Sequence, residues 1–166
     1  IGSQENKNKV HQFDFQHKVA KFWLFGFTSQ FIENELTTEN FNSRNFLLKE
    51  YDISPGIQYV LDTNNRFTFQ YHWVKKKNQL ADFESLNQHK LVAEYFLLGK
   101  KKQQFQTSLT AFSNNFQGNT NSPVGFQMLE GFQDGTNFSW RVLWNQKLNK
   151  FLNLNLSYQG RKSENS

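Results

Sequence analysis

The sequence predicts an all-β protein built as an antiparallel transmembrane β-barrel of the outer-membrane type. The clearest evidence is the run 152–158, Leu-Asn-Leu-Asn-Leu-Ser-Tyr, in which apolar and polar residues alternate strictly. Successive side chains of a strand point to opposite faces, so the leucines and the tyrosine share one face. The same alternation recurs along most of the chain, with aromatic residues repeatedly on the apolar side. Strands that are apolar on one face and polar on the other are typical of barrels that cross a membrane.

Composition agrees with this class and indicates one domain, residues 1–166. Hydrophobic residues make up 37% of the 166-residue chain, and no run approaches the roughly 20 apolar residues of a spanning helix. A barrel strand needs apolar residues only at every second position, so the low mean hydropathy of −0.74 is compatible with it. Aromatic residues reach 17%, with 19 phenylalanines, which suits a lipid-facing surface. Cysteine is absent, which excludes disulfides and thiolate chemistry.

The net charge is +5, and much of it lies in two lysine runs, 75–77 and 100–102. Such runs can attract nucleic acid or anionic lipid. Each run also follows directly on a predicted strand, so we interpret them as charges at strand ends that keep loops in water. We therefore expect no nucleic-acid partner.

Eight strands are predicted, at about residues 11–18, 21–32, 51–61, 66–74, 90–98, 104–112, 137–145 and 152–158. Helical periodicity is not sustained anywhere, and residues 80–94 are interpreted as a loop leading into the fifth strand. Pro55 lacks an N–H group, so a bulge or a locally open ladder is expected beside it.

The connections between these strands alternate in length. Short ones span 19–20, 63–65, 99–103 and 147–150, whereas long ones span 33–50, 75–89 and 113–136. Outer-membrane barrels have short periplasmic turns and longer external loops. The short connections are therefore expected to face the periplasm and the long ones the outside.

The alternation also assigns side chains to the two faces of the predicted barrel. The residues expected to face lipid are Phe67, Phe69, Tyr71, Trp73, Phe138, Trp140, Trp144, Leu152, Leu154, Leu156 and Tyr158. Those expected to face the lumen are Gln70, His72, Glu94, Arg141, Asn153, Asn155 and Ser157.

Two segments resemble a known group of proteins. Residues 118–140, which include Met128-Leu129-Glu130-Gly131, and residues 152–163 resemble the C-terminal β-barrel region of large outer-membrane proteins from Bacteroidetes-type, Gram-negative bacteria. The resemblance covers about the last third of the chain. It implies a location in the cell outer membrane and carries no catalytic residues.

Members of that group usually continue into a final strand, and a barrel normally has both termini in the periplasm. The eight predicted strands place both ends outside. We therefore expect one more strand at each end, so that the present chain is a partial barrel from a longer protein.

Candidate catalytic and metal-binding residues are sparse. His11, His17, His72 and His89 lack the paired spacing of a metal site, and Glu33, Glu35 and Glu39 lack the spacing of a calcium loop. A glycosidase pair of Glu130 and Asp134 is conceivable, but spacing does not fix their separation. We expect no enzyme activity, no metal and no cofactor.

The expected function is an anchor, or a structural or accessory subunit of an outer-membrane complex, with outer-membrane lipid and other outer-membrane proteins as partners. Residues 113–136 are rich in apolar side chains and are expected to fold over the barrel mouth as a plug or lid, or to meet a partner. The alternative is a soluble antiparallel β-sandwich that binds carbohydrate or a protein through its aromatic residues. A sandwich would cover its aromatic face with a second sheet.

Overall fold

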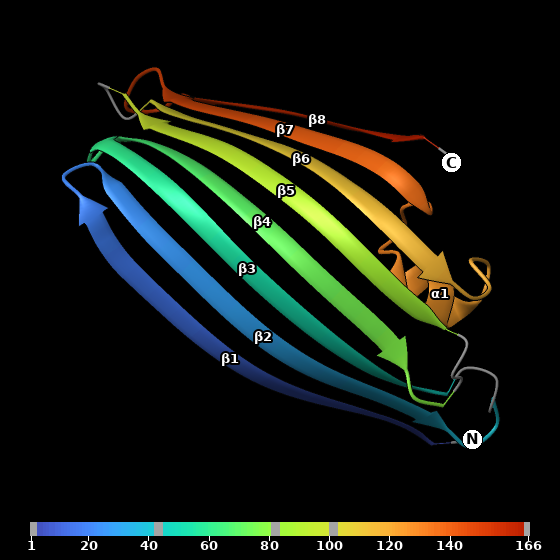
Figure 1. Cartoon of the computed structure of the whole chain (residues 1–166). Helices are drawn as coiled ribbons and strands as arrows, with labels where there is room; N and C mark the ends of the chain where they lie inside the picture. The colour runs from blue at the N-terminus through green and yellow to red at the C-terminus, as the bar shows by residue number, and fades with distance from the viewer. Residues whose placement is uncertain (1–2, 42–44, 81–83, 100–102, 165–166) are drawn as a thin grey trace.

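A single curved antiparallel sheet makes up nearly the whole molecule (Figure 1). The computed structural model describes residues 3–41, 45–80, 84–99 and 103–164. The sheet has eight strands in the order of the sequence, β1 to β8. They are β1 (Gln4–Ala20), β2 (Trp23–Thr38), β3 (Phe46–Asp62), β4 (Asn65–Asn78), β5 (Ser85–Leu98), β6 (Gln104–Gln117), β7 (Gly135–Lys147) and β8 (Asn153–Glu164). The predicted all-β antiparallel class is therefore confirmed.

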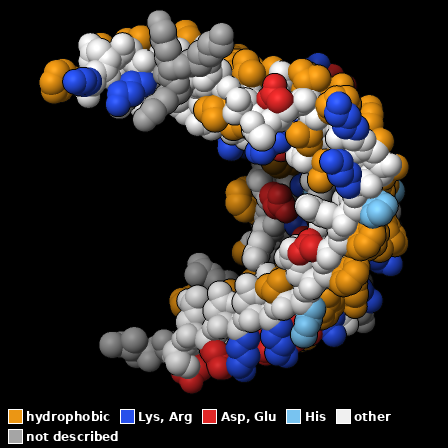
Figure 2. All heavy atoms as spheres, turned by 90° about the vertical axis from the view of Figure 1, so that its left-hand side faces the viewer, with side chains coloured by type: hydrophobic (Ala, Val, Ile, Leu, Met, Phe, Trp, Pro, Cys, Tyr) orange, Lys and Arg blue, Asp and Glu red, His pale blue; other side chains and the backbone are white. Residues whose placement is uncertain are grey.

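The sheet does not close into a barrel. Each strand pairs only with its neighbours in sequence, and β1 does not pair with β8 among the described residues. The sheet bends strongly about its long axis, and Figure 2 shows it end-on as an open C-shaped wall. We call the outer surface of this wall the convex face and the inner surface the concave face. Both ends of the sheet, β1 and β8, present a free edge.

All eight predicted strands exist, but most extend further than the alternation indicated. The extensions lie mainly at the end of the long connections, where β2 runs on to Thr38, β3 already begins at Phe46 and β4 runs on to Asn78. The lysine run 75–77 therefore lies within β4 and not in a loop, which corrects the interpretation given above. The other run, 100–102, lies outside the described residues. Leu152 precedes β8 and belongs to the turn, where its carbonyl accepts hydrogen bonds from the backbone N–H groups of Leu148 and Asn149.

Pro55 sits inside β3 without a register shift at that point. The pairing of β3 with β4 runs from Ile53 opposite Trp73 to Gly56 opposite Gln70 and skips the two residues between. The ladder is thus locally open, as expected next to a residue that cannot donate a backbone hydrogen bond.

One short helix, α1 (Pro123–Met128), interrupts the connection from β6 to β7. Ser122 caps it, because its hydroxyl accepts a hydrogen bond from the Gly125 N–H, and Pro123 occupies the first turn. This helix was not predicted from the sequence. We call residues 118–134, which contain α1, the plug segment.

Candidate functional site

Apolar side chains from every strand form a continuous convex surface. The register places Phe69 opposite Ile57 and Ala93, and Leu109 opposite Ala93 and Trp140, so these side chains share one face. Phe69 is 53% exposed and Leu109 is 58% exposed. Figure 2 shows hydrophobic side chains along the outer rim of the wall. An apolar surface that crosses a whole sheet and is left open marks an interaction surface.

Aromatic rows border this convex surface near both ends of the strands. Toward the short turns, the ring of Trp23 lies 4.8 Å from that of Tyr59, and Phe67 stacks on Tyr95 at 4.4 Å. Toward the plug end, Phe31 lies 4.8 Å from Tyr51, centroid to centroid. Two aromatic rows around an apolar band are the arrangement found at the two interfaces of a membrane.

The apolar band is slightly shorter than the band of known membrane barrels. On β3 it runs from Tyr51 to Tyr59, which is about 26 Å of strand at about 3.3 Å per residue. With the tilt of roughly 35–45° that barrel strands adopt, this length gives a band about 19–22 Å tall. Membrane barrels have an apolar band of about 25 Å.

Charged residues replace aromatic ones just beyond the row at the plug end. Lys9 donates a hydrogen bond to Glu33 at 2.9 Å, and Lys49 lies 3.6 Å from the same carboxylate. The Lys9 hydrogen bond lowers the pKa of Glu33 and raises that of Lys9, so both side chains are charged at neutral pH. The strands therefore continue past the apolar band into a hydrated, charged band.

The structure places the residues expected to face lipid on the convex face, apart from Leu152 in the turn before β8. Side chains opposite one another in adjacent strands share a face. Phe67 on β4 lies opposite Tyr95, and the same row continues through Thr107 and Val142 to Tyr158 on β8, so all of them lie on the convex face. Those on the convex face are Phe67, Phe69, Tyr71, Trp73, Phe138, Trp140, Trp144, Leu154, Leu156 and Tyr158. In the described segments, no second sheet covers them.

The residues expected to face the lumen share the opposite, concave face. They are Gln70, His72, Glu94, Arg141, Asn153, Asn155 and Ser157. The pattern did not reveal that this face also carries buried apolar side chains near the plug, including Val74 and Phe112. His72 lies 3.0 Å from Asp52 across the β3–β4 pair, which gives this histidine a local partner.

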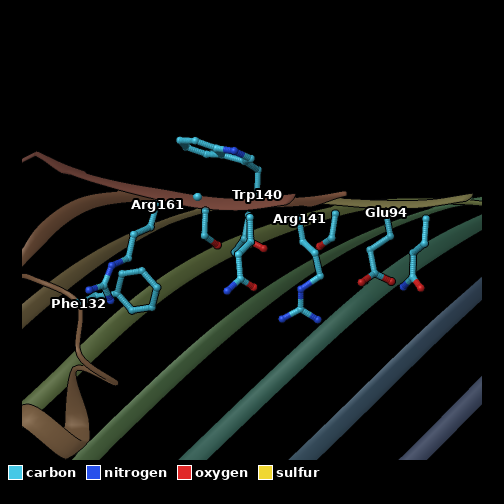
Figure 3. Close-up of a pocket in the computed structure, with 11 residues that line it drawn as sticks. Glu94, Phe132, Trp140, Arg141 and Arg161 are labelled. Carbon is cyan, nitrogen blue, oxygen red and sulfur yellow. The ribbon is translucent and has the colours of Figure 1, made fainter. Parts of the chain in front are cut away.

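A pocket of about 620 Å³ opens on the concave face between β5 and β8 (Figure 3). Glu94, Arg141 and Arg161 point into it, whereas Trp140 points to the other side of the sheet. Phe132, from the plug segment, closes one end. The sequence predicted that Glu94 and Arg141 share a face, but it did not indicate Arg161, because only the pairing of β7 with β8 places Arg161 diagonally across from Arg141.

The plug segment packs on the concave face at the end of the long connections. Val124, Met128 and Leu129 form one buried cluster with Phe46, Leu48, Leu86 and Phe116 of the sheet. Met128 is 0% exposed and Leu86 is 1% exposed. The expectation that residues 113–136 fold over the mouth agrees with this packing, although residues 113–117 continue β6 and Phe126 stays 66% exposed.

Polar contacts fix both ends of the plug segment. Near its start, Ser122 Oγ donates to Glu84 Oε1 at 3.0 Å. At its end, the Gln133 carbonyl accepts hydrogen bonds of 2.9 Å from the side-chain amides of Asn114 and Asn137. The plug is therefore held to the sheet by directional bonds as well as by apolar packing.

An ion-paired lysine joins the middle of the plug to the sheet. Lys76 Nζ lies 2.6 Å from Glu130 Oε1 and 3.4 Å from Glu50 Oε2, and its side chain is only 4% exposed. Glu130 has a φ of 55° and Gly131 a φ of 75°, a pair of left-handed residues that turns the chain after α1. These contacts give the Met128-Leu129-Glu130-Gly131 run a structural role: two residues pack, one forms the ion pair and one makes the turn.

We expect Lys76→Met to loosen the plug. The change keeps the length of the side chain but leaves Glu50 and Glu130 without their cation. Breaking a buried pair costs about 3–5 kcal/mol, and partial exposure of both carboxylates reduces the expected loss to roughly 1–2 kcal/mol. The measurement is the urea concentration at which a protease first cuts residues 118–134. Lys75→Met is the control, because Lys75 is exposed on the same strand; equal cutting of both variants would contradict the role of the ion pair.

The candidate acid pair Glu130 and Asp134 is divided between two structural contacts. Glu130 binds Lys76, and Asp134 Oδ1 accepts a hydrogen bond from the Phe116 N–H at 2.8 Å. The other acidic cluster is also dispersed, since Glu33 pairs with lysines and Glu39 accepts a hydrogen bond from the Ser3 N–H. Within the described ranges, no three histidine or acidic side chains are grouped as metal ligands.

No helix in the described part of the chain is both long and apolar enough to cross a membrane. The chain matches no protein-family model, no curated protein and no solved structure.

Proposed function

We propose that the chain forms part of the wall of an outer-membrane β-barrel and serves as an anchor or as a structural or accessory subunit of an outer-membrane complex. The observation that carries the proposal is the convex apolar band, bordered by aromatic rows and, at the plug end, by paired charges. A soluble sandwich would bury such a face against a second sheet. The described residues form one sheet, so lipid is the partner that suits this face.

The open edges are consistent with this role if other strands complete the wall. A free edge in lipid leaves backbone N–H and C=O groups without partners, at a cost of several kcal/mol each. We therefore propose that β1 and β8 pair with further strands in the membrane. β1 runs away from the plug end and β8 runs toward it, so an even number of added antiparallel strands closes the barrel.

The plug and the side chains of the concave face support a closed lumen and a non-catalytic role. The proposed location is the cell outer membrane, and the resemblance to barrels of Bacteroidetes-type bacteria adds to this proposal. The proposed partners are outer-membrane lipid and other outer-membrane proteins.

The test is membrane fractionation of cells that produce the protein, followed by electrophoresis with and without heating. We expect the chain in the outer-membrane fraction, released only by detergent, with a mobility that changes on heating. A monodisperse chain in detergent-free buffer would overturn the membrane proposal and support the soluble binding module instead.

Orientation can be tested with short epitope tags. A tag after Asn119, in the plug connection, should be labelled on intact cells, because long connections face outward in outer-membrane barrels. A tag after Asn64, in the short turn between β3 and β4, should be labelled only after the cells are opened. The opposite pattern would reverse the orientation.

A further inference from the structure

Two arginines on neighbouring strands point into the concave pocket with a row of hydrogen-bonding side chains between them. Arg141 on β7 lies opposite Gln159 on β8, and Ser139 lies opposite Arg161. The two arginines are thus diagonal neighbours, with Cα atoms about 7–8 Å apart. Ser139 and Gln159 occupy the other diagonal, so four donors face one region.

Arg141 has no ion-pair partner within the part of the chain that the structure describes. The nearest acid lining the pocket is Glu94, which lies opposite Ser108, and Ser108 lies opposite Arg141. The two residues therefore start from strands about 10 Å apart, and among the described residues their side chains form no ion pair with each other. Figure 3 shows both side chains directed into the same space and separated.

Arg161 is positioned by the plug. Its guanidinium lies 5.9 Å from the centre of the Phe132 ring, and Phe132 itself packs edge-on against Phe112 at 4.6 Å. The plug thus holds Arg161 at one end of the pocket, so only the Arg141 side chain has to be ordered when a ligand binds.

We propose that this pocket binds the carboxylate, sulfate or phosphate group of a small anionic solute between Arg141 and Arg161. Guanidinium groups bind such oxyanions through charge-assisted hydrogen bonds, and two of them outweigh the single Glu94. Glu94 favours ligands with a hydroxyl or amino group next to the anion and opposes larger polyanions. The pocket volume, about 620 Å³, lies within the usual range of ligand sites. The proposal does not depend on whether the convex face meets lipid.

The test is a titration of the full chain, purified in detergent, with inorganic phosphate, inorganic sulfate and acetate at constant ionic strength. The readout is the side-chain N–H resonances of ¹⁵N-labelled arginine. We expect saturable shifts for Arg141 and Arg161 in the millimolar range. Arg141→Gln and Arg161→Gln should each weaken binding by about tenfold, and Glu94→Gln should strengthen phosphate binding, because it removes the opposing charge.

Arg66→Gln is the matched control, because Arg66 lies on the same face over the Phe96 ring and does not line the pocket. It should leave binding unchanged. Absence of saturable shifts in the unmodified chain would overturn the proposal, and so would an equal loss in Arg66→Gln. A dispersed amide spectrum shows that each variant is folded. Binding of dihexanoyl phosphatidic acid without binding of inorganic phosphate would identify a lipid headgroup and overturn the assignment to a solute.

Discussion

Replacing Phe69 by arginine is expected to destabilise the membrane-folded protein by about 2–4 kcal/mol, the cost of an arginine on the lipid side near the bilayer midplane. Phe69 lies in the middle of the apolar band on β4 and is 53% exposed on the convex face. In water, arginine at so exposed a position would change stability by only a few tenths of a kcal/mol. The size of the effect therefore reports whether this face meets lipid.

The matched control is the neighbouring residue, Gln70, whose side chain lies on the concave face. Gln70 lines a recess on that face that also contains Thr28, Ser54 and Gln58, so the guanidinium of Gln70→Arg stays near polar side chains and avoids lipid. We expect Gln70→Arg to fold into lipid vesicles with nearly unchanged free energy. The measurement is reversible urea unfolding from vesicles, followed by tryptophan fluorescence. Equal and small effects of the two arginines would contradict a lipid-facing convex surface.

The strands could be predicted because the apolar band requires period-two alternation. On β4, four aromatic side chains alternate with polar ones between Arg66 and Val74, and no helix presents that pattern. Beyond the band, both faces of a strand are polar or mixed, as at Lys75 to Lys77. The sequence there does not alternate between apolar and polar residues, although the backbone hydrogen bonds between the strands continue. The strands were therefore predicted to end too early near the plug.

The faces of the strands could be predicted, but the sites formed by their association could not. Alternation places Arg141 on the concave face, but only the register of β7 with β8 reveals Arg161 as its neighbour. Alternation alone does not predict an open sheet, because it describes a strand's two faces and not the number of strands that closes a barrel. The expectation of a partial barrel came instead from the resemblance and from the predicted side of the two chain ends.

The sequence of the plug contains a signal for the start of a helix. Ser122-Pro123 is a good helix start, since serine caps the first turn and proline is favoured at the first position. Only six residues follow before the chain turns at Glu130 and Gly131. A helix this short shows no helical periodicity in the sequence. The apolar composition of the segment therefore predicted a lid, but the helical conformation of the segment was not predicted.

The second large effect is expected at the centre of the plug. Met128→Ala removes the side chain that fills the space between α1 and Leu86, and such truncations of fully buried residues cost about 2–5 kcal/mol. Because the sheet is held by its own ladders, the loss should fall on the docking of residues 118–134 and not on the whole wall. Amide hydrogen exchange should therefore speed up in the plug and in the adjoining ends of β5 and β6, while exchange in the middle of β4 stays unchanged. Phe126→Ala is the control from the same helix, because that side chain is 66% exposed, and it should alter exchange little. Faster exchange throughout the sheet in Met128→Ala would contradict this expectation, because it would show that docking of the plug stabilises the whole sheet.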